Sequence, residues 1–281
     1  MLQTGCLYLC ATPIGNLEDI TLRVLRILQE VDWVAAEDTR QTLKLFHKFD
    51  LHTPLISYHK FNAQSRGAEL VAKMQEGASI ALVTDAGMPG ISDPGEELVA
   101  LTLAAGIPIV PLPGPCAGIT ALVASGLKTG RFVFEGFLPP KGKERKIRLA
   151  ELKQEKRTII LYESPHRIAK TLQELLEVLG NRPAVLSREL TKKFEQFYRS
   201  DLQQLAEIAQ KEGFRGEITL LLAGNTNIPA AVPQTEMSAL DEVLELEKSG
   251  LPPNQAIKQV AKARGLERQK LYLERSSLKK N

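Results

Sequence analysis

Short apolar runs alternate with amphipathic stretches along the first part of the chain. The runs lie at residues 7–11, 33–36, 78–83 and 107–112, and each is an almost unbroken series of apolar residues. Such runs are typical of strands that are buried on both faces of a parallel sheet. Residues 22–31 instead place their apolar side chains on one face of a helix. The alternation predicts a largely parallel sheet flanked by helices.

A second cycle of this pattern begins near residue 131. Its strand-like runs lie at 132–138, 157–163, 183–190 and 217–223, and its helical patterns at 167–179 and 201–212. The cycle predicts a second α/β domain with more antiparallel character. Turn residues after a predicted helix at 117–126 indicate the boundary between the two. We therefore expect one α/β domain over 1–126 and another over 127–225.

The last part of the chain has a pattern of its own. Residues 226–235 are polar and carry prolines, which indicates a linker. From 236 to 281, three short amphipathic patterns broken by Gly265 resemble a helix-turn-helix module, although a packing or dimerising helical tail would give the same pattern. Residues 251–281 hold eight lysines and arginines against two glutamates. The candidates there for contact with nucleic-acid phosphates are Lys258, Lys262, Arg264, Arg268 and Lys270.

Composition narrows the class of protein. The chain has 281 residues, 43% of them hydrophobic, and is long enough to bury a sizeable core. No apolar run approaches the roughly 20 residues of a membrane helix, and the amino terminus lacks a signal-peptide pattern. We therefore expect a cytoplasmic protein with no membrane partner. Three cysteines argue against a disulfide framework, and without histidine–cysteine pairs at ligand spacing we expect no metal site.

A net charge of +3 conceals a second basic run at 141–148, which has five cations and one glutamate. Lys141, Lys143 and Arg145 are its candidates for phosphate contact. Taken alone, this run is more simply explained as a solvated helix face. Together with the basic tail it favours a polyanionic partner.

The segment LVTDAGMPGISDPG, residues 82–95, indicates a binding site at the end of a buried strand. It carries two aspartates, three glycines and two prolines, more than a simple strand-to-helix turn needs. Glycines let a backbone approach a ligand closely, and Asp85 lies where the strand ends, the usual mouth of an α/β crevice. A turn with an aspartate cap is the alternative explanation.

Three further loops follow predicted strands, at 12–21, 36–42 and 111–122, and a fourth, at 160–168, belongs to the second domain. The first contains a single glycine, Gly15, so neither a dinucleotide fingerprint nor a P-loop is present. The pattern therefore favours a ligand without phosphate. Glu37 and Asp38 in the second loop also suit a helix cap. Taken together, the loops predict a cleft at the strand ends.

These segments carry a resemblance. LYLCATPIGNLEDIT, AAEDTR, ALVTDAGMPGISDPG, PLPGPCAGITALVASGL, FEGFLPPKGKER and YESPHRI resemble the bacterial small-subunit ribosomal RNA methyltransferase I family of the tetrapyrrole methylase superfamily, over nearly the whole chain. The resemblance implies methyl transfer from S-adenosylmethionine to the ribose 2′-hydroxyl of a cytidine, cytidine 1402, in the decoding region of 16S ribosomal RNA. It also implies two α/β domains with the cofactor between them, a terminal helix-turn-helix module, a homodimer, and a target within the small ribosomal subunit.

The resemblance further implies which residues bind the cofactor. These are Pro13, Asp85, Ala86, Gly87, Met88, Gly114, Pro115, Cys116, Ala117, Tyr162, Glu217, Thr219 and Ala223. The sequence departs from the family at two positions, because Cys116 replaces a usual serine and Ser200 an expected glycine.

Methyl transfer to a ribose hydroxyl needs alignment and assistance in removing a proton. Glu37, Asp38, Glu163 and His166 combine an acid or imidazole with a strand-end position. Asp93 is a further candidate base, and the residues alone do not select among the five. Arg40 and Arg167 are assigned to RNA phosphate or ribose, because a guanidinium pairs with phosphate oxygens.

Two other functions fit part of the pattern. A methyltransferase of corrinoid or other tetrapyrrole precursors would leave the basic tail unexplained. A helix-turn-helix regulator that senses a ligand would leave the acidic strand-end loops unexplained.

Overall fold

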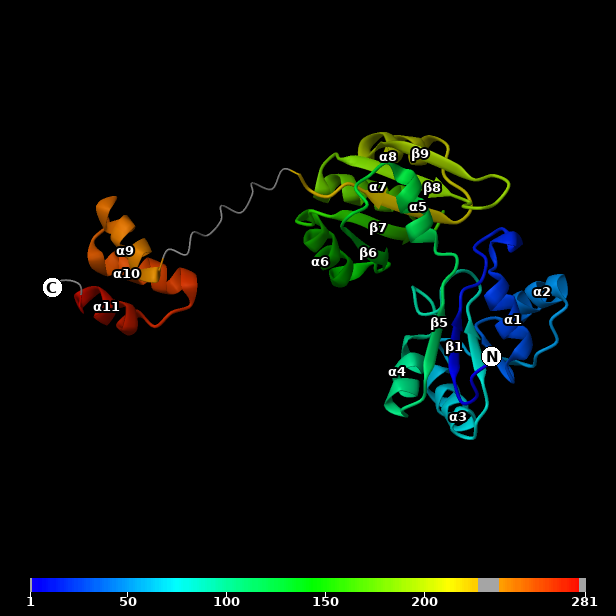
Figure 1. Cartoon of the computed structure of the whole chain (residues 1–281). Helices are drawn as coiled ribbons and strands as arrows, with labels where there is room; N and C mark the ends of the chain where they lie inside the picture. Colours follow the sequence, from blue (N-terminus) through cyan, green and yellow to red (C-terminus); the bar gives the residue numbers. More distant parts are fainter. Residues whose placement is uncertain (1, 227–237, 278–281) are drawn as a thin grey trace. The chain divides into compact units, whose positions relative to one another are not determined.

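The computed structural model describes residues 2–226 and 238–277, which form two units, Met1–Thr226 and Asn227–Asn281 (Figure 1). The predicted linker lies, apart from Thr226, outside the described residues. The predicted boundaries at 126 and 225 stay predictions. Within the described ranges, no helix is both long and apolar enough to cross a membrane.

The first sheet has five parallel strands in the order β3-β2-β4-β1-β5. This confirms the predicted parallel sheet, with one strand more than the sequence indicated, the three-residue β3. The elements are β1 (Leu7–Cys10), η1 (Leu17–Asp19), α1 (Leu22–Glu30), β2 (Trp33–Ala36), α2 (Thr39–Phe49), β3 (Leu55–Ser57), α3 (Ala63–Gln75), β4 (Ile80–Val83), α4 (Glu96–Ala104), β5 (Ile109–Leu112) and α5 (Ala117–Ser125).

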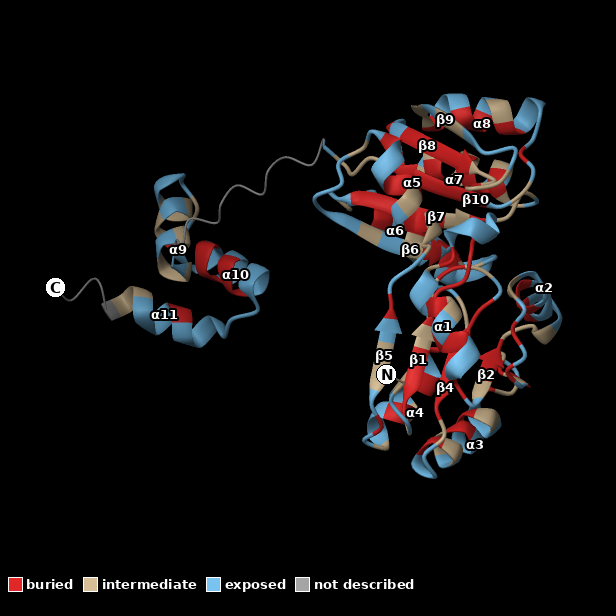
Figure 2. Cartoon of the chain, turned by 45° about the vertical axis from the view of Figure 1, so that its right-hand side comes forward, coloured by how far each residue is buried: buried red, intermediate tan, exposed pale blue. Residues whose placement is uncertain are grey.

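Helices cover both faces of this sheet. Val24 and Ile27 of α1 share an apolar cluster with Val34 on one face, and α2 joins it. On the other face, Leu70 of α3 and Leu98 of α4 pack with the neighbouring strand residues. The central strands are therefore buried on both sides, as Figure 2 shows, and this explains their unbroken apolar runs.

The second sheet is mixed and has the order β6-β7-β10-β8-β9. Only β6 and β7 run parallel, so the predicted antiparallel character is confirmed. The sequence pattern did not indicate β9. The elements are β6 (Phe132–Phe137), α6 (Gly142–Lys153), β7 (Thr158–Glu163), α7 (Ile168–Leu179), β8 (Pro183–Arg188), β9 (Gln196–Asp201), α8 (Leu202–Lys211) and β10 (Ile218–Leu222).

Helices α6, α7 and α8 pack on one face of the second sheet. The other face is covered by α5, whose Ala121 and Leu122 contact a cluster that includes Ile160 and Leu221. Ile14, from the loop after β1, belongs to the same cluster. The loop after β1 and helix α5, which both follow strands of the first sheet, therefore contact the second sheet.

One end of the second sheet gathers three loops. Ile218, the first residue of β10, lies opposite Glu163 at the end of β7 and opposite Arg188 at the end of β8. The segments 163–167, 189–192 and 214–217 therefore lie at the same end of the sheet. This end of the sheet contributes the second half of the site.

The tail unit holds three helices, α9 (Ala239–Lys248), α10 (Pro253–Arg264) and α11 (Arg268–Ser277). Its apolar centre contains Val243, Ile257, Val260 and Leu271. Gly265 ends α10 with φ +65°, in the left-handed region that favours glycine. The three-helix pattern predicted for this segment is confirmed.

The loop after β1 lies so close to the loop after β8 that a side chain at Gly15 has no room. A Cβ there would lie 2.9 Å from the carbonyl oxygen of Leu190 and 2.8 Å from Oγ1 of Thr191. We expect Gly15→Ala to lower the free energy of unfolding by about 1–3 kcal/mol through overpacking. Urea denaturation measures this loss.

Gly130→Ala is the matched control, because a Cβ at Gly130 meets no atom within 4 Å. It should leave stability nearly unchanged. Equal losses in the two variants would contradict the tight contact at Gly15.

Candidate functional site

A cavity of about 340 Å³ lies where the strand-end loops of the first sheet meet the three loops of the second. It brings together ten residues that the sequence analysis selected: Ala86, Gly87, Met88, Asp93, Cys116, Ala117, Tyr162, Glu163, Glu217 and Thr219. Most of its other lining residues are apolar. The cavity therefore suits a ligand with an apolar part.

The remaining predicted cofactor residues lie outside this cavity. Pro13 and Asp85 line a neighbouring cavity of about 250 Å³, which shares Ile14, Ala86 and Glu217 with the first. Gly114 and Pro115 line neither cavity. Ala223 is at the opposite end of β10, where its N–H donates to the carbonyl of Pro183.

The loop after β4 is fixed to the loop after β1. The N–H of Thr12 donates to the Gly87 carbonyl at 2.9 Å, and the Gly87 N–H donates back at 3.0 Å. Gly87 has φ +86°, which suits glycine. The N–H and the carbonyl of Gly87 are thus both engaged in hydrogen bonds within the chain. A ligand would therefore contact Gly87 through the part of its surface that lines the cavity.

Tyr162 connects the two halves of the cavity wall. Its hydroxyl accepts the N–H of Gly118 in the first turn of α5 at 3.0 Å. Its ring forms T-shaped pairs with Phe134 and Phe137, whose ring centroids lie 5.1 and 5.7 Å away. Burial, with a smaller contribution from Cys116, raises the pKa of Tyr162 to about 12. Tyr162 therefore stays protonated at neutral pH.

Three carboxylates, Glu37, Asp85 and Asp93, lie near one another in the loops that follow β2 and β4. The N–H of Asp38 donates to Asp85 at 3.2 Å, and the N–H of Asp85 donates to Glu37 at 3.4 Å. Burial raises the pKa of Glu37 and of Asp85. Burial, then the charges of Glu37 and Asp85, raise the pKa of Asp93 to about 7.

Asp93 lines two neighbouring hollows of the molecule. Together with Ser92 it lines both the 340 Å³ cavity and an adjacent groove of about 660 Å³. Glu37, Tyr58 and Lys60 belong to the groove. Asp93 is therefore an acid that borders both the cavity and the groove.

Asp38 and Arg40 form an ion pair. Asp38 is the N-cap of α2 and accepts the Arg40 N–H at 2.9 Å. The Arg40 guanidinium also binds this carboxylate with two nitrogens, at 3.0 and 2.7 Å. This pairing lowers the pKa of Asp38 to about 2, which makes Asp38 a weak base.

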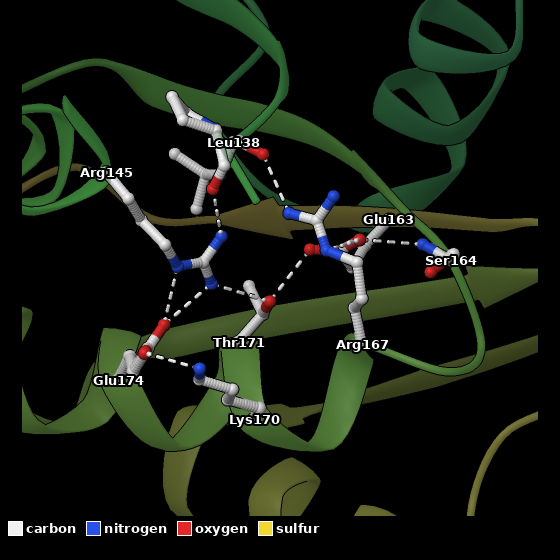
Figure 3. Close-up of polar contacts among 9 residues, drawn as sticks. Leu138, Arg145, Glu163, Ser164, Arg167, Lys170, Thr171 and Glu174 are labelled. Carbon is white, nitrogen blue, oxygen red and sulfur yellow. Dashed lines mark hydrogen bonds and ion pairs between the residues drawn. The ribbon is translucent and has the colours of Figure 1, made fainter. Parts of the chain in front are cut away.

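Glu163 lies on the cavity wall within a network of hydrogen bonds (Figure 3). It is 3% exposed and accepts from the Ser164 N–H at 2.8 Å and from the Thr171 hydroxyl at 2.7 Å. Nε of Arg167 lies 3.3 Å from its carboxylate. His166 is exposed and lines none of the cavities described above.

The predicted phosphate-binding cations fall into two groups. Arg145 is 4% exposed, and each nitrogen of its guanidinium has a protein partner (Figure 3), which favours a structural role. Arg167 donates to the carbonyl of Leu138. The exposed cations are Arg40, Lys141, Lys143, Lys258, Lys262, Arg264, Arg268 and Lys270. Of these, Arg40 is paired with Asp38 and Arg264 with Glu242.

Sequence reasoning missed Ser92 and the loop after β8. Leu190 lines the cavity, and Lys192 bridges Glu189 and Glu217 at 3.1 and 3.0 Å. Ser92, Glu189 and Thr191 have positive φ although none is glycine. Such conformations cost about 1–3 kcal/mol each and gather at functional sites, but no residue type signals them here.

Comparisons with known proteins place this site in context. A model of the family Tetrapyrrole (Corrin/Porphyrin) Methylases matches residues 6–206. The relative named Ribosomal RNA small subunit methyltransferase I from Halalkalibacterium halodurans is 47% identical over 95% of this chain and 93% of its own length. The protein of the same name from Synechocystis sp. is 50% identical over 95% of this chain and 96% of its own length.

Two solved structures share the fold. Uroporphyrin-III-C-methyltransferase from Thermus thermophilus superposes with a TM-score of 0.57 at 22% identity, covering 78% of this chain and 94% of its own. The same enzyme complexed with S-adenosyl homocysteine gives 0.56 at 21% identity, with 77% and 96% covered. At these identities the likeness concerns the fold alone.

The raised pKa of Asp93 has a consequence for stability. In the unfolded chain its carboxyl ionises near pH 3.8, whereas in the folded protein it keeps its proton to about pH 7. The stability that it contributes below pH 3.8 is therefore lost as the pH rises towards 7. We expect Asp93→Asn to be more stable than the wild type at about pH 8 and similar at about pH 4.

Urea denaturation of both proteins at the two pH values measures the difference. Glu96→Gln, an exposed acid of the same groove, is the control and should show no such trend. A wild type as stable as Asp93→Asn at both pH values would contradict the raised pKa of Asp93.

Proposed function

This chain belongs to the ribosomal RNA small subunit methyltransferase I group of the tetrapyrrole (corrin/porphyrin) methylase family, and on that premise we propose that it methylates small-subunit ribosomal RNA with S-adenosylmethionine. The finer proposal is transfer to the ribose 2′-hydroxyl of a cytidine in 16S RNA, cytidine 1402. The observation that carries it is the cavity between the two sheets, because it assembles strand-end residues selected for such a cofactor.

The cavity's chemistry fits this cofactor. Glu163, Asp93 and Glu217 supply carboxylates for a cationic ligand, and Met88 and Leu190 supply apolar surface for a ring. Among the described residues that line the cavity there is no lysine or arginine, as expected for a ligand without phosphate. When bound, the cofactor supplies an activated methyl group for an in-line displacement.

We assign the acceptor ribose to the groove beside the cavity and the proton acceptor to Asp93. A hydroxyl reaching from the groove towards the cavity passes Asp93, which lines both. A pKa of about 7 is suited to a general base, because half the groups are ionised at neutral pH. Glu37 lines the groove but not the cavity, while Asp38 and Glu163 are held by Arg40 and by the Thr171 network.

Exposed cations provide the RNA contacts in this proposal. Lys60 lies in the groove, and Lys141 and Lys143 begin the basic helix α6. In the tail unit, α10 and α11 expose further lysines and arginines. Phosphate contacts of this kind make binding steeply dependent on salt. A ribosomal substrate also places the enzyme in the cytoplasm.

An apolar face supports a homodimer. Ile119 and Val123 of α5 are 44% and 70% exposed, and Phe132 and Phe134 of β6 are 38% and 36% exposed. Phe134 lies beside Gly118 of α5, so the two elements are neighbours. Apolar surface of this kind is typical of subunit interfaces.

Labelled methyl transfer tests the proposed function. The full chain with S-adenosylmethionine should modify small ribosomal subunits or 16S RNA at one cytidine ribose, and that position should resist alkaline cleavage. Tetrapyrroles serve as the alternative acceptors. Transfer to a tetrapyrrole without transfer to RNA would contradict the proposal.

Asp93→Asn should slow single-turnover methylation by about 100-fold to 10,000-fold, the usual contribution of a general base. The rate is measured with saturating RNA and cofactor, so that weakened binding does not enter. Glu76→Gln, at an exposed acid that lines none of the cavities described above, should keep most of the wild-type rate. If Asp93→Asn keeps more than about a tenth of that rate, Asp93 is not the base.

Deletion of residues 236–281 should leave S-adenosylmethionine affinity nearly unchanged and weaken RNA binding, with a shallower dependence on salt because phosphate contacts are lost. Calorimetry measures the first quantity and RNA titrations at several salt concentrations the second. An unchanged salt slope would show that the tail serves packing or dimerisation instead.

A further inference from the structure

We propose that Arg145 is a positioning residue that, with Arg167, ties the start of the basic segment 138–143 to the Glu163 carboxylate on the cavity wall. The inference rests on the proposed function, because it assigns the segment's lysines to the RNA substrate. It concerns two arginines that the sequence analysis had assigned to RNA itself.

Arg145 is buried and fully engaged. Its Nη1 donates to the carbonyl of Pro139 at 2.9 Å, its Nη2 to Oγ1 of Thr171 at 2.8 Å, and its Nε to Glu174 at 2.7 Å. A guanidinium binds three partners in fixed directions because its donors form a rigid planar fork. Arg145 therefore fixes the positions of these three groups relative to one another.

Thr171 connects Arg145 to the cavity wall through two hydrogen bonds. Its hydroxyl has a single hydrogen. Because Arg145 donates to the oxygen, that hydrogen is free to be donated onward, and the recipient is Glu163 at 2.7 Å. The chain of contacts from Glu174 through Arg145 and Thr171 ends at a carboxylate that lines the cavity.

Arg167 closes the network from the other side (Figure 3). Its Nε lies 3.3 Å from Glu163, and its Nη2 donates to the carbonyl of Leu138 at 2.7 Å. Two consecutive carbonyls, those of Leu138 and Pro139, are thus held by two arginines that both lead to Glu163. The start of segment 138–143 cannot shift without disturbing that carboxylate.

Only Pro140 separates the anchored carbonyls from Lys141, the first of the exposed lysines. Pro139 and Pro140 have restricted φ, so the direction set at the anchors is carried to Lys141. Lys141 is the N-cap of α6, and Lys143 is in its first turn. The network therefore sets the distance between the phosphate-binding lysines and the cavity.

Arg145→Lys tests this role, since lysine keeps the charge and loses the fork. We expect faster amide hydrogen exchange in segment 138–143 and at Ser164, whose N–H donates to Glu163. The KM for RNA should rise about tenfold, the equivalent of one lost hydrogen bond to a charged group. The Kd for S-adenosylmethionine should rise less than the KM for RNA, because Asp93, Glu217 and the apolar wall of the cavity are unchanged.

Arg148→Lys is the matched control. Arg148 is also on α6 and pairs with the buried Glu135, but it contacts neither segment 138–143 nor Glu163. It should change neither the exchange rates nor the KM for RNA. Thr171→Val removes only the hydroxyl that joins Arg145 to Glu163, and it should raise the KM in the same direction, which provides the test if Arg145→Lys does not fold.

The outcomes separate this inference from the proposed function. A folded Arg145→Lys with wild-type exchange and wild-type KM would overturn the inference while the enzyme remains an RNA methyltransferase. If the wild type methylates no RNA, the proposed function fails, and with it the role given to the lysines. The exchange data then still decide whether Arg145 orders the segment.

Discussion

The site depends on the apolar contact between the two sheets. Ile14, from the loop after β1, packs with Leu190, from the loop after β8, in the same cluster as the inner face of α5. Full burial of each such side chain stabilises the fold by about 1.5–3 kcal/mol. Because this contact joins loops and not strands, it holds the ends of both sheets against each other, with the cavity beside it.

That contact also stabilises a costly arrangement around the cavity. Ser92, Glu189 and Thr191 have unfavourable φ, and partial burial beside two other carboxylates raises the pKa of Asp93. Hydrogen bonds across the contact offset part of the strain, among them the Asn16 N–H to Oγ1 of Thr191 at 3.0 Å. The strained residues thus keep their positions because both halves constrain them.

Much of the fold could be predicted because the central strands are buried on both faces. The run at 33–36 coincides with β2, and the predicted helix at 117–126 ends one residue beyond α5. The three residues of β3 are too few for a periodic pattern. β9 is an edge strand of half-exposed residues, so it lacks a continuous apolar run.

The site could be predicted only in part. Loop composition indicated the acidic ends of β2 and β4, and the resemblance indicated Tyr162 and the start of β10. Arg145 had the sequence signature of a phosphate contact, yet its partners Thr171 and Glu174 are 26 and 29 residues away along the chain. No local pattern could have revealed its burial. The cofactor and catalytic assignments stay predictions.

Amide hydrogen exchange with and without S-adenosylmethionine tests the central claim, that one ligand is held between the ends of the two sheets. Exchange should slow on cofactor addition both in the loop 84–93 of the first sheet and in the segment 214–219 of the second, and it should be unchanged in the tail unit. Protection confined to the loops of one sheet would contradict a shared site.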